Sequence, residues 1–174
     1  MTKKQKYALN KIITALPNDC RENYLEIVEY AISLDYMPVL AGKQEDKLDF
    51  RKSKTKKTIL SIRTKNNSLQ IAMRFYALQE YTGIFKEALD ARIDMYIKHG
   101  FKINESETRH FECSRKCGLC DGTHGYSFIL PDEKYGFFCG HDVIPLPTFR
   151  AESIQEVKEA LKIQDELHLK QTFE

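Results

Sequence analysis

The stretch CSRKCGLCDG, residues 113 to 122, contains three cysteines within eight consecutive positions. Their spacing is C-x3-C-x2-C, and Cys139 follows Cys120 after a gap of eighteen residues. Four thiolates can complete the closed tetrahedral shell of a structural zinc ion. Clustered cysteines in a reducing compartment are more often metal ligands than disulfides. We therefore expect Cys113, Cys117, Cys120 and Cys139 to hold one structural Zn²⁺.

The residues between Cys120 and Cys139 predict a hairpin that carries Cys139 back towards the other three cysteines. Two short aromatic segments, YSFIL and YGFFC, flank the turn sequence PDEK. A unit of about thirty residues has too little core to fold alone, so a bound metal would help to order it. Residues 113–141 thus resemble a zinc ribbon. One of His110, His124 and His141 could replace a thiolate in the ligand set.

Other interpretations of the cysteine cluster fit less well. The C-x3-C-x2-C spacing also matches radical S-adenosylmethionine enzymes, but the 54 residues after Cys120 cannot build their large barrel. A thioredoxin-type C-x-x-C requires a helix that the following DGTHG sequence would interrupt. The H-x-E and C-x-x-C signature of zinc deaminases is only half matched, because Lys116 stands where that pattern has proline. Buried thiols without a metal stay open as an alternative.

A second candidate site is the basic run RKSKTKK, residues 51 to 57. Each exposed basic side chain can neutralise a phosphate of a nucleic acid. The alternative is a solvated loop without a partner. Arg63 and Lys65 could extend the patch along the neighbouring hairpin. The run predicts nucleic-acid contacts from Arg51, Lys52, Lys54, Lys56 and Lys57.

The aromatic residues of the predicted zinc hairpin have two possible roles. They could stack on bases, or they could form the core of the small module. We expect packing, since so small a unit must bury something. The residues concerned are Tyr126, Phe128, Tyr135, Phe137 and Phe138.

Composition is that of an ordinary globular protein of 174 residues, with 42% hydrophobic and 30% charged residues. The net charge of +2 is too small for the whole chain to act as a nucleic-acid clamp, so any such contact must be local. The sequence contains no apolar run long enough to cross a bilayer, and MTKKQKYALN does not resemble a signal peptide. We expect a cytoplasmic protein without a membrane partner.

The elements that position these candidates follow from hydrophobic periodicity. Apolar residues recur at helical spacing in four segments, while alternation with period two predicts strands at residues 60–63 and 69–75, joined through KNNS, with KLDF as a neighbouring strand. The helical stripes are Leu9, Ile12, Ile13 and Leu16; Tyr24, Leu25, Val28, Ala31 and Ile32; Phe85, Leu89, Ile93 and Ile97; and Ile154, Val157, Leu161, Ile163 and Leu167. Ser153 and Glu156 have the spacing of a capping box for the last helix.

This order of elements predicts an α+β fold, an antiparallel sheet with helices on one face. We expect an α+β domain at residues 1–100, a zinc-ribbon-like module at 101–150, and a C-terminal helix at 151–174 that packs on the rest. Residues 5–98, with Met37-Pro38-Val39-Leu40 before the sheet, resemble the small bacterial iron-chaperone-like proteins. That family has Phe where this chain has Leu40, and the resemblance implies a fold but no functional residue.

The sequence favours a non-enzymatic, zinc-binding module whose partner is nucleic acid. It has no glycine-rich phosphate loop and no recognisable arrangement of Ser, His and Asp for nucleophilic catalysis. Two alternatives stay open. One is an enzyme or small-molecule binder with a pocket between sheet and helices, and the other is a protein-interaction adaptor. The oligomeric state is not indicated.

Overall fold

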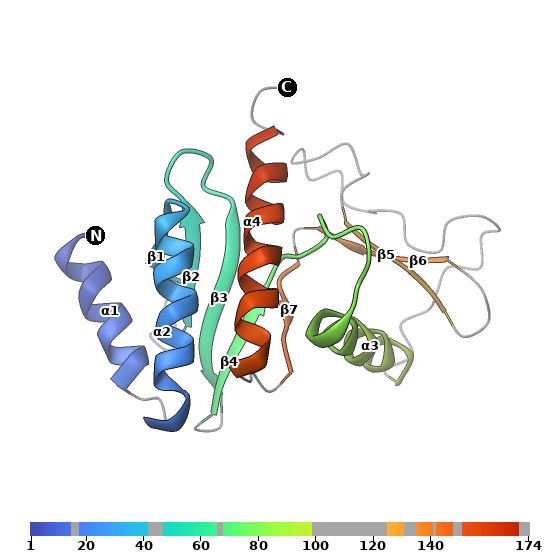
Figure 1. The fold of residues 1–174 in the computed structure, drawn as a ribbon, viewed down its shortest axis with the longest axis horizontal. Helices are drawn as coiled ribbons and strands as arrows, with labels where there is room; N and C mark the ends of the chain where they lie inside the picture. Colours follow the sequence, from blue (N-terminus) through green and yellow to red (C-terminus); the bar gives the residue numbers. More distant parts are fainter. Residues whose placement is uncertain are drawn as a thin grey trace.

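The computed structural model describes residues 1–14, 18–41, 47–65, 68–98, 125–130, 135–140, 142–147 and 151–170. The predicted α+β class is confirmed (Figure 1). The helices are α1 (Lys3–Thr14), α2 (Asn18–Ser33), α3 (Gly83–Lys98) and α4 (Ile154–Lys170), the last preceded by a 3-10 turn at Ala151–Ser153. The strands are β1 (Tyr36–Leu40), β2 (Lys47–Lys52), β3 (Thr58–Lys65), β4 (Ser68–Met73), β5 (Gly125–Ile129), β6 (Tyr135–Cys139) and β7 (Ile144–Pro145).

The main sheet has the strand order β1-β2-β3-β4-β7, and each neighbouring pair is antiparallel. The predicted hairpin is β3 and β4, and KLDF lies in β2. The two edge strands, β1 and β7, contain Pro38 and Pro145. Proline suits an edge because it has no N–H to donate to a further strand. Strands β5 and β6 form a separate two-stranded sheet.

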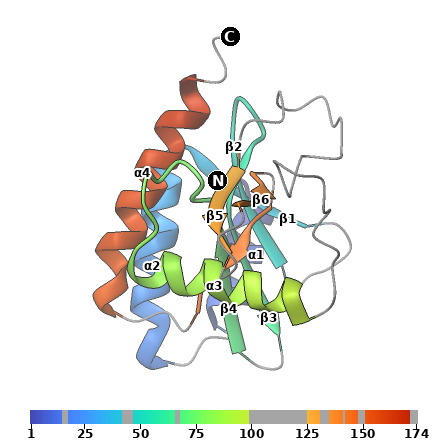
Figure 2. The same cartoon turned by 90° about the vertical axis from the view of Figure 1, so that its right-hand side faces the viewer.

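The hydrophobic core lies between the main sheet and its helices. Helices α1 and α2 pack on β1, and α4 packs against α2 and β3. Figure 1 shows α2 and α4 in front of the sheet, and Figure 2 shows α3 on the side that faces the viewer. Helix α3 contacts β7. The strands turn alternate residues towards the helices, namely Tyr36, Leu48, Phe50, Leu60, Ile62, Ile71 and Met73, each 2% exposed or less.

Most of the predicted helical stripes are buried. Leu9 in α1, Val28 in α2, Leu89 in α3 and Leu161 in α4 are all buried. Ile97 was expected on the buried side of α3, but its side chain is 51% exposed. Because it lies in the last turn of α3, beyond Ile93, it does not reach the core described here.

The β5–β6 hairpin shares its core with the sheet. Tyr126, Phe128, Leu130 and Phe138 belong to the same hydrophobic cluster as the sheet and the helices. The ring of Phe128 lies over Gly136, its partner across the hairpin. A Cβ at Gly136 would be 2.1 Å from Phe128 Cε2, so glycine makes room for the ring. The structure thus confirms packing for Tyr126, Phe128 and Phe138.

The last helix meets the start of α3. Glu156, expected in a capping box with Ser153, directs its carboxylate at Gly83, where a Cβ would lie 2.5 Å from Glu156 Oε1. Gly83 has a φ of 48°, a left-handed value that glycine adopts easily. Among the helices within the described ranges, none is long and apolar enough to span a membrane.

Candidate functional site

The basic run begins in β2 with Arg51 and Lys52 and continues as a tight turn, residues 53–57, that leads to β3. Lys54 and Lys56 are exposed, and Lys57 is partly exposed. The backbone N–H of Lys56 donates to the carbonyl of Lys52 at 3.0 Å, and Lys56 Nζ donates to the carbonyl of Ser53 at 2.7 Å. Lys56 has a φ of 59°, which costs a residue other than glycine about 1 kcal/mol. The turn therefore presents two lysine charges to solvent.

Arg51 lies on the side of β2 that faces away from the helices. This side also carries Lys47 and Asp49, since alternate residues of a strand point to opposite faces. Asp49 Oδ2 accepts a hydrogen bond from Arg51 at 2.8 Å, Asp49 Oδ1 accepts one from Ser61 at 2.7 Å, and Lys47 Nζ lies 3.2 Å from Oδ1. Burial acts to raise the pKa of Asp49, but these hydrogen bonds and charges outweigh it and lower the pKa. Asp49 is thus an ionised carboxylate that holds two cations on one face.

Arg63 of β3 completes a group of cations on that face. It is the register partner of Lys47, and its guanidinium donates to Gln70 Oε1 of β4 at 2.8 Å. The side chains of Lys47 and Arg51 are 30% and 40% exposed, and Arg63 is also partly exposed. We call Lys47, Arg51 and Arg63 the basic strand face. The negative charge of Asp49 offsets one of the three positive charges of the basic strand face.

Lys52 points in the opposite direction, into the space between sheet and helices. It is 8% exposed, and its Nζ donates to Asp165 Oδ1 and to the carbonyl of Leu34, each at 2.7 Å. The same nitrogen lies 4.9 Å from the centre of the Tyr36 ring. The charge of Lys52 is therefore paired with Asp165 inside the protein, whereas Lys54 and Lys56 are exposed.

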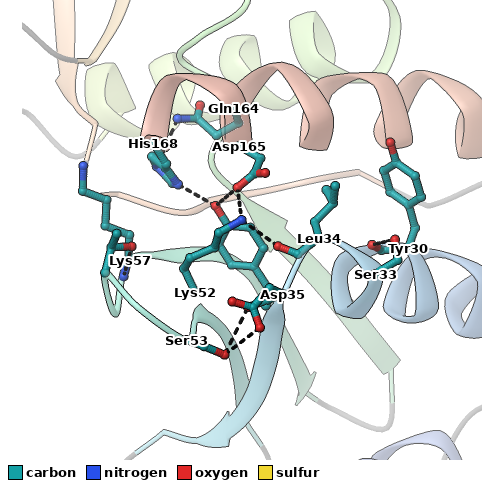
Figure 3. A network of polar contacts seen from close by, with 12 residues as sticks. Tyr30, Ser33, Leu34, Asp35, Lys52, Ser53, Lys57, Gln164, Asp165 and His168 are labelled. Atoms are coloured by element: carbon teal, nitrogen blue, oxygen red, sulfur yellow. Dashed lines mark hydrogen bonds and ion pairs between the residues drawn. The ribbon is translucent and has the colours of Figure 1, made fainter. Parts of the chain in front are cut away.

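Asp165 is the centre of a buried polar network that joins β1, β2 and α4 (Figure 3). The hydroxyl of Tyr36 lies 2.9 Å from Asp165 Oδ1 and 2.9 Å from His168 Nδ1. Gln164 Nε2 lies 3.2 Å from His168 Nε2, and Gln164 Oε1 accepts from the N–H of Ala77 at 3.1 Å. Tyr36, Gln164 and His168 are at most 1% exposed. We call these side chains with Lys52 and Asp165 the α4 network.

The direction of each hydrogen bond in the α4 network follows from one fixed end. Because Gln164 Oε1 accepts from a backbone N–H, its Nε2 must be the donor towards His168 Nε2. His168 then carries its proton on Nδ1 and donates to the Tyr36 oxygen. The Tyr36 hydroxyl is left to donate to Asp165. In this arrangement each of these contacts joins one donor to one acceptor.

The electrostatics agree with this arrangement. Burial, and next the charge of Asp165, raise the pKa of Tyr36 far above its ordinary value, so the phenol keeps its proton. Buried polar groups that satisfy one another fix a single packing arrangement. The α4 network thus fastens the C-terminal half of α4 to the sheet. The sequence pattern does not reveal this network, because Gln164, Asp165 and His168 resemble the solvent side of a helix.

The aromatic side of the hairpin is not open to bases. Tyr126 is fully buried, and its ring centre lies 4.9 Å from that of Phe75 and 5.8 Å from that of Tyr76. Its hydroxyl donates to the carbonyl of Asp142 at 3.1 Å. Burial raises the pKa of Tyr126 well above its ordinary value. Phe137 keeps partial exposure on the other side of β6.

Of the predicted zinc ligands, the structure describes Cys139 alone. This partly exposed residue ends β6 and is the register partner of Gly125. Nearby, burial lowers the pKa of Arg74, a buried guanidinium. The remaining predicted or alternative ligands, Cys113, Cys117, Cys120, His110, His124 and His141, lie outside the described residues. Within the described ranges, no group of three or more His, Cys, Asp or Glu residues could hold a metal ion.

No protein-family model, curated protein or solved structure matches this chain.

Proposed function

We propose that the protein binds nucleic acid without catalysing a reaction, through Lys54 and Lys56 of the β2–β3 turn and the basic strand face. The observation that carries this proposal is the register of β2 and β3, which places Lys47 opposite Arg63 with Arg51 on the same side. Lys47 and Arg51 are four positions apart along the strand, which corresponds to about 13 Å. Such a length corresponds to about four phosphates of one duplex strand.

The exposure of these cations supports a role in solution. Lys54 and Lys56 are exposed, and Lys56 occupies a left-handed position in which glycine or asparagine would be less strained. Lys52 takes no part in the proposed contact because its charge lies beside Asp165. Arg51 keeps 40% of its side chain exposed although it also pairs with Asp49.

The α4 network favours the binding role over the enzymatic alternative. It occupies the region between sheet and helices, and it contains His, Asp, Lys and Tyr, the residue types of many active sites. Tyr36, Asp165 and His168 are 0%, 6% and 1% exposed, and the Tyr36 hydroxyl bonds to both of the others. A network closed on itself in this way is better suited to holding α4 than to meeting a substrate.

The test compares two charge-matched double variants. Lys54→Gln/Lys56→Gln and the control Lys162→Gln/Lys170→Gln each remove two exposed charges, from the turn and from α4 respectively. Binding of labelled duplex DNA is titrated at about 50 and about 200 mM salt. We expect the turn variant to lower the log-log salt slope by about 1.8, which is about 0.9 for each lost phosphate contact. The control should leave it unchanged.

Two results would contradict the proposal. The wild-type protein could bind neither duplex nor single-stranded oligonucleotide at low salt. Alternatively, the two double variants could weaken binding equally, which would mean that the total charge matters and the turn does not. Unchanged unfolding midpoints of both variants would show that the fold is intact.

We also propose that Cys113, Cys117, Cys120 and Cys139 bind a structural zinc ion. Support comes from the pairing of Cys139 with Gly125, because Cys120 precedes Gly125 by only five residues of the chain. A reducing compartment such as the cytoplasm would keep these thiols available to the metal. Elemental analysis should find about one zinc per chain, and Cys117→Ser should release it. Purified protein that lacks zinc and keeps a well-ordered hairpin would contradict this proposal.

A further inference from the structure

Helix α1 is a basic element outside the predicted basic run. Its sequence, KKQKYALNKIIT, contains four lysines and no acidic residue. The first turn is well formed, because Thr2 Oγ1 accepts from the N–H of Gln5 at 3.3 Å and Gln5 Oε1 accepts from the N–H of Thr2 at 2.7 Å. This reciprocal pair is a capping box. Lys3 and Lys4 therefore lie on an ordered helix.

Tyr7 is at the centre of the solvent side of α1. Its side chain is 70% exposed, whereas Tyr36 and Tyr126 are fully buried. Residues three and four positions apart are neighbours on a helix, so Lys3 and Lys4 lie one turn before Tyr7 and Asn10 and Lys11 one turn after it. Lys3, Lys4, Asn10 and Lys11 are all exposed. An aromatic ring thus stands among cations on an open surface.

The opposite side of α1 packs in the hydrophobic core. Ala8, Leu9, Ile12 and Ile13 are buried in the core. A helix that inserts into a membrane surface needs a free apolar face, and α1 has none to offer beyond Tyr7. A ring surrounded by cations matches instead a single-stranded nucleic acid, whose bases stack on aromatic rings while its phosphates meet lysines.

We propose that α1 is a single-strand binding surface, on which Tyr7 stacks against an unpaired base and Lys3 and Lys4 contact the adjoining phosphates. This inference rests on the proposed function and specifies its ligand. Since α1 packs on β1, and β1 pairs with β2, the surface belongs to the same part of the fold as the β2–β3 turn. Stacking needs an exposed base, so the contact with Tyr7 distinguishes single strands from duplexes.

The experiment measures the affinity of the full chain for a labelled oligouridylate and for duplex DNA. Tyr7→Ala removes the ring, and the control Tyr7→Phe keeps it. We expect Tyr7→Ala to weaken oligouridylate binding about tenfold, while Tyr7→Phe stays within about twofold of the wild type. Duplex binding should change little in both. Lys3→Gln/Lys4→Gln should lower the salt slope on the single strand by about 1.4, which is about 0.7 for each contact.

The outcomes separate this inference from the proposed function. If Tyr7→Ala binds oligouridylate like the wild type while Lys54→Gln/Lys56→Gln loses affinity, the role of α1 is wrong and the turn stands. If Tyr7→Ala alone loses affinity, α1 is supported and the turn is not. Preference for vesicles of phosphatidylcholine and phosphatidylserine over oligouridylate would overturn the nucleic-acid assignment of α1. Unfolding midpoints show whether each variant is folded, and a substitution at 70% exposure should change them little.

Discussion

Removing the carboxylate of Asp165 should destabilise the protein strongly. Asp165→Asn keeps the size of the side chain but leaves Lys52 as a buried cation without a carboxylate, in contact with the carbonyl of Leu34 and the ring of Tyr36. The side chains of Lys52 and Asp165 are only 10% and 9% exposed. Loss of one partner of a buried pair costs about 3 kcal/mol or more in the free energy of unfolding. We expect this loss for Asp165→Asn, and a similar loss for Lys52→Met.

The two changes should not add. In Lys52→Met/Asp165→Asn no uncompensated charge remains, so we expect the double variant to lose about 3 kcal/mol instead of about 6 kcal/mol. Urea-induced unfolding of the wild type, both single variants and the double variant measures the coupling. The matched control is the exposed pair Lys86 and Asp90 on α3, with 63% and 52% exposure, where the coupling should stay below about 0.5 kcal/mol.

A small coupling between Lys52 and Asp165 would refute this reasoning. A value below about 0.5 kcal/mol, equal to that of the control pair, would mean that water screens both charges as it does at the surface. Tyr36→Phe provides an independent measure, because it leaves the His168 Nδ1 proton without its acceptor. We expect that variant to lose about 1 to 3 kcal/mol.

Asp49→Asn should destabilise the protein at neutral pH, because the lowered pKa of Asp49 gives stability only while the carboxylate is ionised. In urea unfolding, the difference in stability from the wild type should shrink as the pH falls below 3.8, the ordinary pKa of an aspartate. A difference that stays constant with pH would contradict this. Because the pKa of Tyr126 is raised, the folded state retains a proton that the unfolded state releases above pH 10.0. Wild-type stability should therefore fall with rising pH in this range, by up to about 1.4 kcal/mol per pH unit more steeply than the stability of Tyr126→Phe. Equal slopes would show that the phenol ionises in the folded state. Gly83→Ala should lower the free energy of unfolding by about 1 to 2 kcal/mol, because position 83 has a φ of 48°. Adding Glu156→Ala should recover little of this loss in thermal unfolding, since the backbone strain stays. Full recovery would mean that the cost comes from contact with the Glu156 carboxylate.

The sequence by itself determined the elements and much of the core. Helical spacing located α1 through Leu9, Ile12 and Ile13, and alternation in Leu60 and Ile62 located β3, because burial on one side repeats with the period of the backbone. It did not identify β1 as a strand of its own or β7 as the partner of β4. Two residues of β7 are too few to produce a pattern, and β1 contains Pro38.

Only the tertiary structure decided which residues of the basic run face solvent. The sequence treats Arg51, Lys52 and Lys54 alike, yet strand alternation sends Arg51 to the outer face and Lys52 towards Asp165, which is 113 residues away in the chain. A lysine can be buried only where a carboxylate compensates its charge, and no local pattern reveals a partner so distant. For the same reason, the sequence does not predict that Gln164 and His168 are buried. Their burial depends on where α4 crosses the sheet, and their partners, Ala77 and Tyr36, are distant in the chain.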